Sequence, residues 1–348
     1  MEVIKVIGPT VLAFFIGIFI TPFFTRYFYK YKMWKKRPRI EANTSDEFNS
    51  IHNTEGEVST PRVGGIIIWV AVLLSVLVIY ILAGVYPSEL TLKLNFLSRS
   101  QTLVPLGAFF LAAFVGLFDD LLQIFGKSSY ANDALNYRRV KIVFVTLIGL
   151  AISFWFYYKL EFTSVHLPFV GDWHLGLWFI PFFVIVMLAT FSTSVIDGLD
   201  GLAGGVMASI FGSYAIIAFI QNQMDISALS GALLGAILAF LWFNIPPARF
   251  YMGETGMLAL SVLLTVIAFL TDTVLILPII ALPLVVTTLS VLIQIYTYKF
   301  FNHHRVFRVA PLHHHFQAIG WSREKVVMRY WIVSVISATL GVILILVS

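Results

Sequence analysis

The sequence contains no cysteine and few charged residues. The absence of cysteine among 348 residues excludes disulfide bonds and thiolate metal sites. Charged residues make up 12% of the chain and hydrophobic residues 59%, whereas an average soluble domain has about 25% charged and about 45–50% apolar residues. We therefore expect a protein that crosses a membrane several times rather than a soluble one.

A small-residue cleavage pattern is also missing after the first apolar run, residues 3–28. That run exceeds the roughly 20 apolar residues needed to span a bilayer, so we expect a membrane helix there and not a cleaved signal peptide. The same criterion predicts an all-α polytopic membrane protein, a single integral-membrane domain over residues 1–348 with about ten transmembrane helices. The expected helices cover residues about 3–28, 63–84, 103–124, 140–159, 175–194, 202–220, 227–243, 256–270, 274–300 and 325–347.

The distribution of basic residues predicts the orientation of these helices. The net charge is +5 and 23 residues are Lys or Arg, but they lie in loops between the apolar runs, so we expect no nucleic-acid partner. Only Lys5, Lys93, Arg99 and Lys159 fall on one side of the ten helices, and the others fall on the opposite side. Because short loops rich in Lys and Arg stay in the cytoplasm, we expect both termini outside. The expected cytoplasmic loops are about 29–62, 125–139, 195–201, 244–255 and 301–324.

The third expected helix ends in the segment GLFDDLLQIFGK, residues 116–127. Asp119 and Asp120 are adjacent acids at the membrane border, where an unpaired carboxylate needs a partner, a cation or water. Mg²⁺ takes one or two carboxylates together with substrate phosphate oxygens, and Lys127 follows closely. The segment indicates a site for Mg²⁺ and phosphate, with a solvated helix end as the alternative.

The segment STSVIDGLDGLAGG, residues 192–205, places two more acids between the fifth and sixth helices. Asp197 and Asp200 are three residues apart, so on a helix they would share a face. The glycines around them leave the backbone bare for close packing or for a phosphate. A glycine-rich packing turn is the alternative, but packing alone does not require two carboxylates.

Two further polar segments precede expected helices. TPRVGG, residues 60–65, has a proline suited to a helix entry and two glycines that allow close backbone approach. FNIPPARFYMGETG, residues 243–256, offers Asn244 as a polar group, Tyr251 as a stacking ring and Glu254 as a carboxylate. Taken separately, the first segment reads as a helix start and the second as a polar loop.

Three consecutive histidines occur in RVAPLHHHFQAIGW, residues 308–321. Adjacent side chains cannot all converge on one ion from a helix or a strand, and nothing nearby completes a zinc ligand set. We therefore expect His313, His314 and His315, which lie shortly after Arg308, to contact a diphosphate or its sugar. The alternative is a structural role for the imidazoles.

The order of these segments resembles a known family. TPRVGG, the paired aspartates, DGLDGLAGG, FNIPPARFYMGETG and APLHHHFQ, together with the later GW and KVVMRYW, are similar to the motifs of the polyprenyl-phosphate N-acetylhexosamine-1-phosphate transferases. The resemblance covers residues about 52–335. The histidine segment, GW and KVVMRYW are most similar to the branch that transfers phospho-N-acetylmuramoyl-pentapeptide.

This resemblance implies a reaction at the bacterial plasma membrane. Phospho-MurNAc-pentapeptide would move from UDP-MurNAc-pentapeptide to undecaprenyl phosphate, giving lipid I and UMP, the first membrane step of peptidoglycan synthesis. The resemblance further implies Mg²⁺ as the cofactor, a cytoplasmic active site on a multi-pass protein surrounded by membrane lipid, and a homodimer.

The resemblance also implies roles for individual residues. The expected catalytic residues are Asp119, Asp120, Asp200, Glu254 and His313. The expected substrate-binding residues are Lys127, Lys141, Asp197, Asn244, Tyr251, His314 and His315. The expected metal ligands are Glu254, Asp119 and Asp120.

Several positions depart from the family pattern. Glu254 stands where the family usually has aspartate, Gln123 where it usually has lysine, and Phe191 and Ser194 where asparagines are expected. These departures keep two alternatives open, a relative that transfers GlcNAc-1-phosphate and a catalytically inactive relative. A transporter is disfavoured, because transporter sites usually lie at the membrane midplane between repeated halves, and this sequence shows no such repeat.

Overall fold

The computed structural model describes residues 2–36, 54–97, 101–125 and 134–348, and in this part of the chain helices dominate. Ten of the described helices are long and apolar enough to cross a membrane. The ten spans are formed by α1 (Glu2–Lys30), α4 (Gly65–Val85), α6 (Leu103–Phe125), α8 (Ala134–Lys159), α9 (Phe179–Ser192), α10 (Leu202–Ile220), α11 (Met224–Asn244), α12 (Gly253–Leu270), α14 (Leu282–Phe300) and α16 (Arg323–Val347). Helix α9 is long enough only together with the 3-10 turns on either side of it, over Gly176–Ile196.

Short elements join the long helices. The two strands pair antiparallel, with Ser164 opposite His174. Short 3-10 turns at Gly176–Trp178 and Thr193–Ile196 flank α9. The remaining short elements are α3 (Thr54–Glu57), α5 (Glu89–Leu94), β1 (Ser164–Leu167), β2 (Gly171–His174), α13 (Leu277–Ile280) and α15 (Leu312–Ala318).

The ten expected membrane helices are confirmed, and one needs a correction. The ninth was expected to run unbroken over residues 274–300, but α13 ends at Ile280 and α14 begins only at Leu282. Pro278 and Pro283 are the second residues of α13 and α14 respectively. Proline has no N–H for the helix ladder and clashes with the preceding turn, so each proline lies in the first turn of a new helix instead of inside a continuous one.

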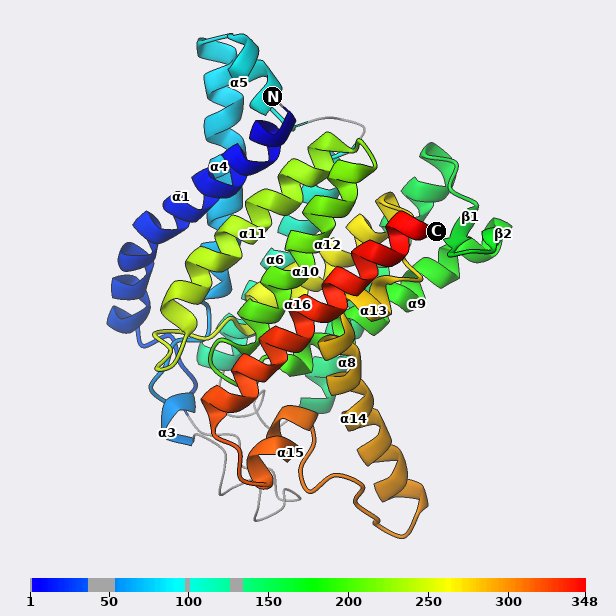
Figure 1. Ribbon diagram of the computed structural model, residues 1–348. Coiled ribbons are helices and arrows are strands. Elements are labelled where there is room, and N and C mark those ends of the chain that lie inside the picture. The colour runs from blue at the N-terminus through cyan, green and yellow to red at the C-terminus, as the bar shows by residue number, and fades with distance from the viewer. Residues whose placement is uncertain (1, 37–53, 98–100, 126–133) are drawn as a thin grey trace.

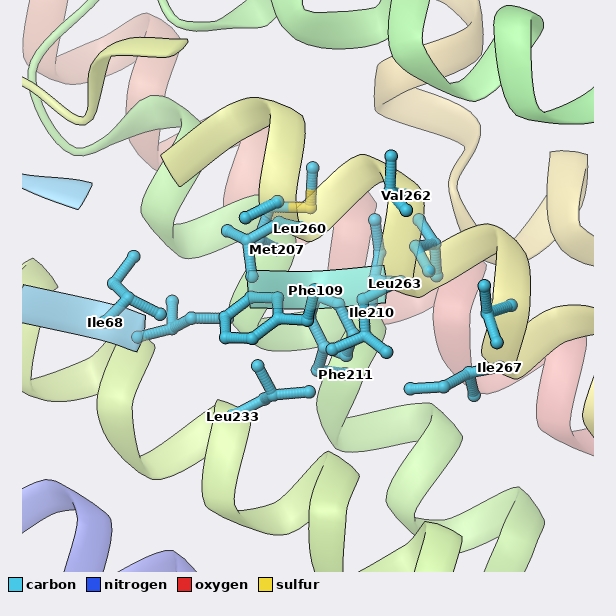
Figure 2. Packing of buried hydrophobic residues seen from close by; sticks show 14 of the residues in the cluster. Ile68, Phe109, Met207, Ile210, Phe211, Leu233, Leu260, Val262, Leu263 and Ile267 are labelled. Carbon is cyan, nitrogen blue, oxygen red and sulfur yellow. The ribbon is translucent and has the colours of Figure 1, made fainter. Parts of the chain in front are cut away.

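Helix α12 forms the centre of the bundle. Of its most apolar stretch 94% is buried, against 17% for α1, and α12 packs against α6, α9 and α4. Figure 2 shows Phe109 of α6 among apolar side chains that include Met207 of α10 and Leu263 of α12. A helix that is apolar on every side is expected in a protein core or a membrane.

The polar segments gather at one end of the bundle. Helices α4, α8, α10, α12 and α16 begin at this end, and α6, α9 and α11 finish there. In Figure 1 the start of α1 and the end of α16 lie in the upper half, whereas α3 and α15 lie at the bottom with the polar end. The lower part of α14 extends away from the other helices.

Candidate active site

Two aspartates from other segments cap the first turn of α12. The backbone N–H of Gly253 donates to Asp197 Oδ2 at 3.1 Å. The N–H groups of Glu254 and Thr255 donate to Asp120 Oδ1 and Oδ2 at 3.3 and 2.9 Å, and the Thr255 hydroxyl donates to Asp120 Oδ2 at 2.7 Å. The first N–H groups of a helix have no partner within it. We call Asp120 and Asp197 the α12 cap.

The α12 cap decides what this helix end can bind. The N-terminus of a helix carries a partial positive charge that attracts anions. Here two carboxylates already occupy that place, so it is not available to a substrate phosphate. Burial raises the pKa of Asp197 to about 6, although the nearby Arg62 guanidinium and the bond from Gly253 favour its ionised form.

Only glycine fits at the first position of α12. Gly253 has φ +68°, and a Cβ atom there would meet the carbonyl oxygen of Arg62 and the carboxylate of Asp120. Positive φ costs other residues conformational energy. The glycine therefore allows the capped turn to lie directly against residue 62.

Residues 60–65 form backbone hydrogen bonds with the segment that leads into α12. Tyr251 N donates to Pro61 O at 2.7 Å, and the N–H groups of Gly64 and Gly65 donate to the carbonyl oxygens of Tyr251 and Met252, each at 2.9 Å. A Cβ atom on Gly65 would meet the backbone of α12. The expected close approach of backbone at TPRVGG is confirmed, and its partner is the Tyr251 segment.

Four side chains from three helices form a group beside the cap. Lys141 Nζ of α8 lies 2.7 Å from Glu254 Oε1 and 3.3 Å from Asp119 Oδ2. Gln123 Nε2 donates to the same Asp119 oxygen at 2.8 Å. Asp119 Oδ1 and Glu254 Oε2 are buried and have no hydrogen-bond partner among the residues the structure describes. We call Asp119, Gln123, Lys141 and Glu254 the ion-pair cluster.

The turn between α9 and α10 corrects an expectation about Asp197 and Asp200. These acids were considered on one helical face, but they lie in the turn between the 3-10 segment Thr193–Ile196 and α10. Gly201, with φ +77°, directs the chain into α10 at that point. The two carboxylates consequently reach different partners, since Asp200 Oδ2 accepts from Ala248 N at 3.1 Å. Burial raises the pKa of Asp200.

Asn244 joins this turn to the segment before α12. Its Oδ1 accepts from Gly201 N at 3.0 Å, and its Nδ2 donates to Phe250 O at 2.8 Å. The indole N–H of Trp331 donates to Gly201 O at 3.0 Å. Asn244 is buried, so it holds two loops in register while both of its polar atoms are engaged.

His313 is the buried member of the histidine triplet. It lies on α15 against Gly198, where a Cβ atom would meet its imidazole. Neither ring nitrogen has a hydrogen-bond partner within the described part of the chain. Burial, reinforced by His314, holds the pKa of His313 well below its usual value, so the ring is neutral at physiological pH.

His314 and His315 have other neighbours. His314 Nδ1 is 2.8 Å from Gln317 Oε1. His315 Nδ1 accepts from the backbone N–H of Arg308 at 3.2 Å. The three imidazoles thus have three different surroundings, as expected for adjacent side chains that do not share one ion.

The structure joins most of the expected site residues. Asp119, Asp120, Lys141, Asp197 and Glu254 surround the first turn of α12. Four others reach the same end of the bundle through the neighbouring segments, namely Asp200, Asn244, Tyr251 and His313. Burial raises the pKa of the half-buried Tyr251 hydroxyl. Lys127 lies outside the described residues.

Sequence reasoning missed Thr255. Its hydroxyl and N–H both bind Asp120, yet it was not among the expected site residues. The available signal was its place directly after Glu254, at the start of an apolar run, where a polar side chain can serve a helix terminus.

Comparison with known proteins identifies the family. A family model described as glycosyl transferase family 4 matches residues 102–272. The phospho-N-acetylmuramoyl-pentapeptide-transferase of Chloroflexus aurantiacus is 34% identical over 84% of this chain and 78% of that protein. Proteins with the same name from Caldanaerobacter subterraneus and Geobacillus thermodenitrificans are 33% and 32% identical, over 96% and 98% of both chains. This chain belongs to the phospho-N-acetylmuramoyl-pentapeptide-transferase family.

Within this chain, the family-model match begins just before α6 and ends just after α12. It therefore contains the α12 cap and the ion-pair cluster. The histidines of α15 lie beyond it, but the relatives that cover 96% and 98% of the chain extend over that end of the protein. The membership rests on these long matches.

The ion-pair cluster contains carboxylate oxygens of the kind that bind a hard cation. No group of three or more acidic or histidine side chains in the described residues forms a complete metal site. Asp119 and Glu254, however, each keep one buried oxygen without a partner, and Mg²⁺ needs only one or two carboxylates when substrate phosphate supplies further ligands. Both oxygens of Asp120 already accept bonds from α12. Asp119 and Glu254 are thus the carboxylates that fit a metal.

Proposed function

We propose that this chain transfers phospho-MurNAc-pentapeptide from UDP-MurNAc-pentapeptide to undecaprenyl phosphate, giving lipid I and UMP, with Mg²⁺ as cofactor. The observation that carries the proposal is the ion-pair cluster, in which Asp119 and Glu254 flank one ammonium and each present a free oxygen. The similar proteins are named for the transfer of phospho-N-acetylmuramoyl-pentapeptide, and we take the transferred group from them. In this proposal, catalysis depends on the charged groups of Asp119, Lys141 and Glu254 lying beside the diphosphate of the donor.

The reaction exchanges one phosphoanhydride for another. An oxygen of the acceptor phosphate attacks the phosphorus that bears the sugar, and the bond from that phosphorus to the bridging oxygen breaks. UMP leaves with the bridging oxygen, so no water is consumed. Such transfers depend on positioning and on neutralising phosphate charge rather than on covalent chemistry by the protein.

Each group of residues has a task in this reaction. Lys141 pairs with phosphate oxygens, and Asp119 orients the acceptor phosphate. Asp120 and Asp197 hold the first turn of α12, which carries Glu254. Bound Mg²⁺ would neutralise charge on the diphosphate, held by Asp119 and Glu254. The imidazoles of α15 and the Tyr251 ring contact the sugar nucleotide.

We place the site on the cytoplasmic side of the bacterial plasma membrane, with both termini outside. All Lys and Arg except Lys5, Lys93, Arg99 and Lys159 belong to the five polar loops and helix ends on the side of the site, and such loops stay in the cytoplasm. The chain is a single membrane domain, and the homodimer stays a prediction.

The absence of cysteine allows a direct test of this orientation. Lys93 on α5 and Arg249 before α12 are exposed at opposite ends of the bundle. In intact cells, a membrane-impermeant maleimide is expected to label the protein with Lys93→Cys and not the protein with Arg249→Cys. The reverse labelling pattern would contradict the assignment.

Release of UMP by purified protein in detergent tests the reaction. The assay contains undecaprenyl phosphate, Mg²⁺ and either UDP-MurNAc-pentapeptide or UDP-GlcNAc as donor, with EDTA as the control. We expect UMP from the muramoyl donor alone, abolished by EDTA. UMP from UDP-GlcNAc would identify a GlcNAc-1-phosphate transferase, and no UMP from either donor with folded protein would identify an inactive relative.

A further inference from the structure

Lys141 occupies the place between the two carboxylates that fit a metal. Its ammonium lies 2.7 Å from Glu254 and 3.3 Å from Asp119, and the three side chains are 16%, 19% and 4% exposed. Among the described residues it is the sole cationic group within 4.0 Å of either carboxylate. The neighbouring contact to Asp119 comes from Gln123, a neutral amide. Lys141 therefore balances one of the two negative charges of this cluster.

A divalent cation needs the same carboxylates. An ammonium and Mg²⁺ held by the same two side chains repel each other, and this repulsion is weakly screened because the groups are shielded from solvent. A bound ammonium must therefore weaken the affinity of Asp119 and Glu254 for a metal. Two groups that compete for one site oppose each other's binding by the same factor.

We propose that Lys141 is a resident counterion that keeps the divalent cation from Asp119 and Glu254 until a diphosphate gives the ammonium another anionic partner. The proposal rests on the proposed function, because the diphosphate is that of the donor. When the diphosphate arrives, Lys141 turns to its oxygens and releases the carboxylates to the cation. The metal and the nucleotide then bind cooperatively, whereas the metal alone binds weakly.

The chain offers matched variants at this position. Lys141→Met keeps the length and the apolar stem of the side chain and removes its charge. Lys141→Arg keeps the charge and therefore keeps the competition. Combining Lys141→Met with Glu254→Gln removes one carboxylate as well, which distinguishes a cation in the ion-pair cluster from a cation bound elsewhere.

Binding of Mn²⁺, measured by electron paramagnetic resonance on detergent-purified protein without nucleotide, tests the proposal. We expect weak binding to the wild type and to Lys141→Arg, and binding about tenfold or more tighter to Lys141→Met. The gain should disappear in the double variant. A role of Lys141 in packing alone would lower the unfolding temperature and leave the Mn²⁺ affinity unchanged.

Two results would overturn the proposal. One is unchanged or weaker Mn²⁺ binding by folded Lys141→Met. The other, which requires no variant, is tight micromolar Mn²⁺ binding by the wild type without nucleotide. Neither result bears on UMP release by the wild type, so the failure of this proposal and the failure of the proposed reaction are separate outcomes.

Discussion

Asp119 and Asp120 are neighbours in the sequence, but their carboxylates bind different partners in the structure. Asp120 gives both oxygens to the backbone and hydroxyl of α12. Asp119 faces α8, pairs with Lys141 and keeps one oxygen without a partner in the described residues. Consecutive residues on a helix point in different directions, so one acid fixes the scaffold and the other remains able to bind a ligand.

The first and largest way to test this contrast is Asp120→Ala. The change leaves three donors of the first turn of α12 without their acceptor, and each buried unpaired group costs about 1–3 kcal/mol. We expect the free energy of unfolding to fall by about 3 kcal/mol or more, with loss of UMP release. The measurement is thermal unfolding in detergent beside Asp119→Ala, whose loss should be clearly smaller. Equal losses would remove the distinction.

Asp119→Asn addresses the other side of the comparison. The amide keeps the volume and loses the charge that faces Lys141. We expect UMP release to fall about 100-fold, the effect typical for one electrostatic group in an active site, while the unfolding temperature stays close to that of the wild type. Activity within tenfold of the wild type would contradict a ligand-facing role.

Gly253→Ala alters the cap without removing a charge. A left-handed backbone costs an alanine about 1–2 kcal/mol, and its Cβ would also press on residue 62 and Asp120. We expect a loss of about 2 kcal/mol in the free energy of unfolding. Gly107→Ala on α6 is the control, because no atom lies within 4 Å of a Cβ there, and it should be neutral or slightly stabilising.

The most gradual expected effect concerns pH. Burial raises the pKa of Asp197 to about 6 from an ordinary value of 3.8, so the folded state binds the proton more tightly than the unfolded state. Stability from this group is therefore greatest below pH 4 and is lost as the pH rises towards 6. In EDTA, the unfolding temperature of the wild type should fall between pH 4 and 7 relative to that of Asp197→Asn. A difference independent of pH would contradict this.

The sequence was most informative where one physical requirement dominates. All ten membrane helices could be predicted, because a bilayer demands long apolar runs whatever the neighbouring helices are. The break near Pro283 was missed since an apolar run conceals a helix start. The candidate site residues were taken from their motifs, but the different partners of Asp119 and Asp120 depend on which helices pack against α6. The shared helical face of Asp197 and Asp200 was wrong because Gly201 turns the chain between them and α10.

The α12 cap also has a consequence for the order of assembly. Its two carboxylates belong to segments that a ribosome makes before α12, and domains begin to fold from the N-terminus during synthesis. Asp120 and Asp197 are therefore already in the nascent protein when Gly253 emerges. Helix α12, the most enclosed of the ten, is therefore made after both of the carboxylates that accept the N–H groups of its first turn.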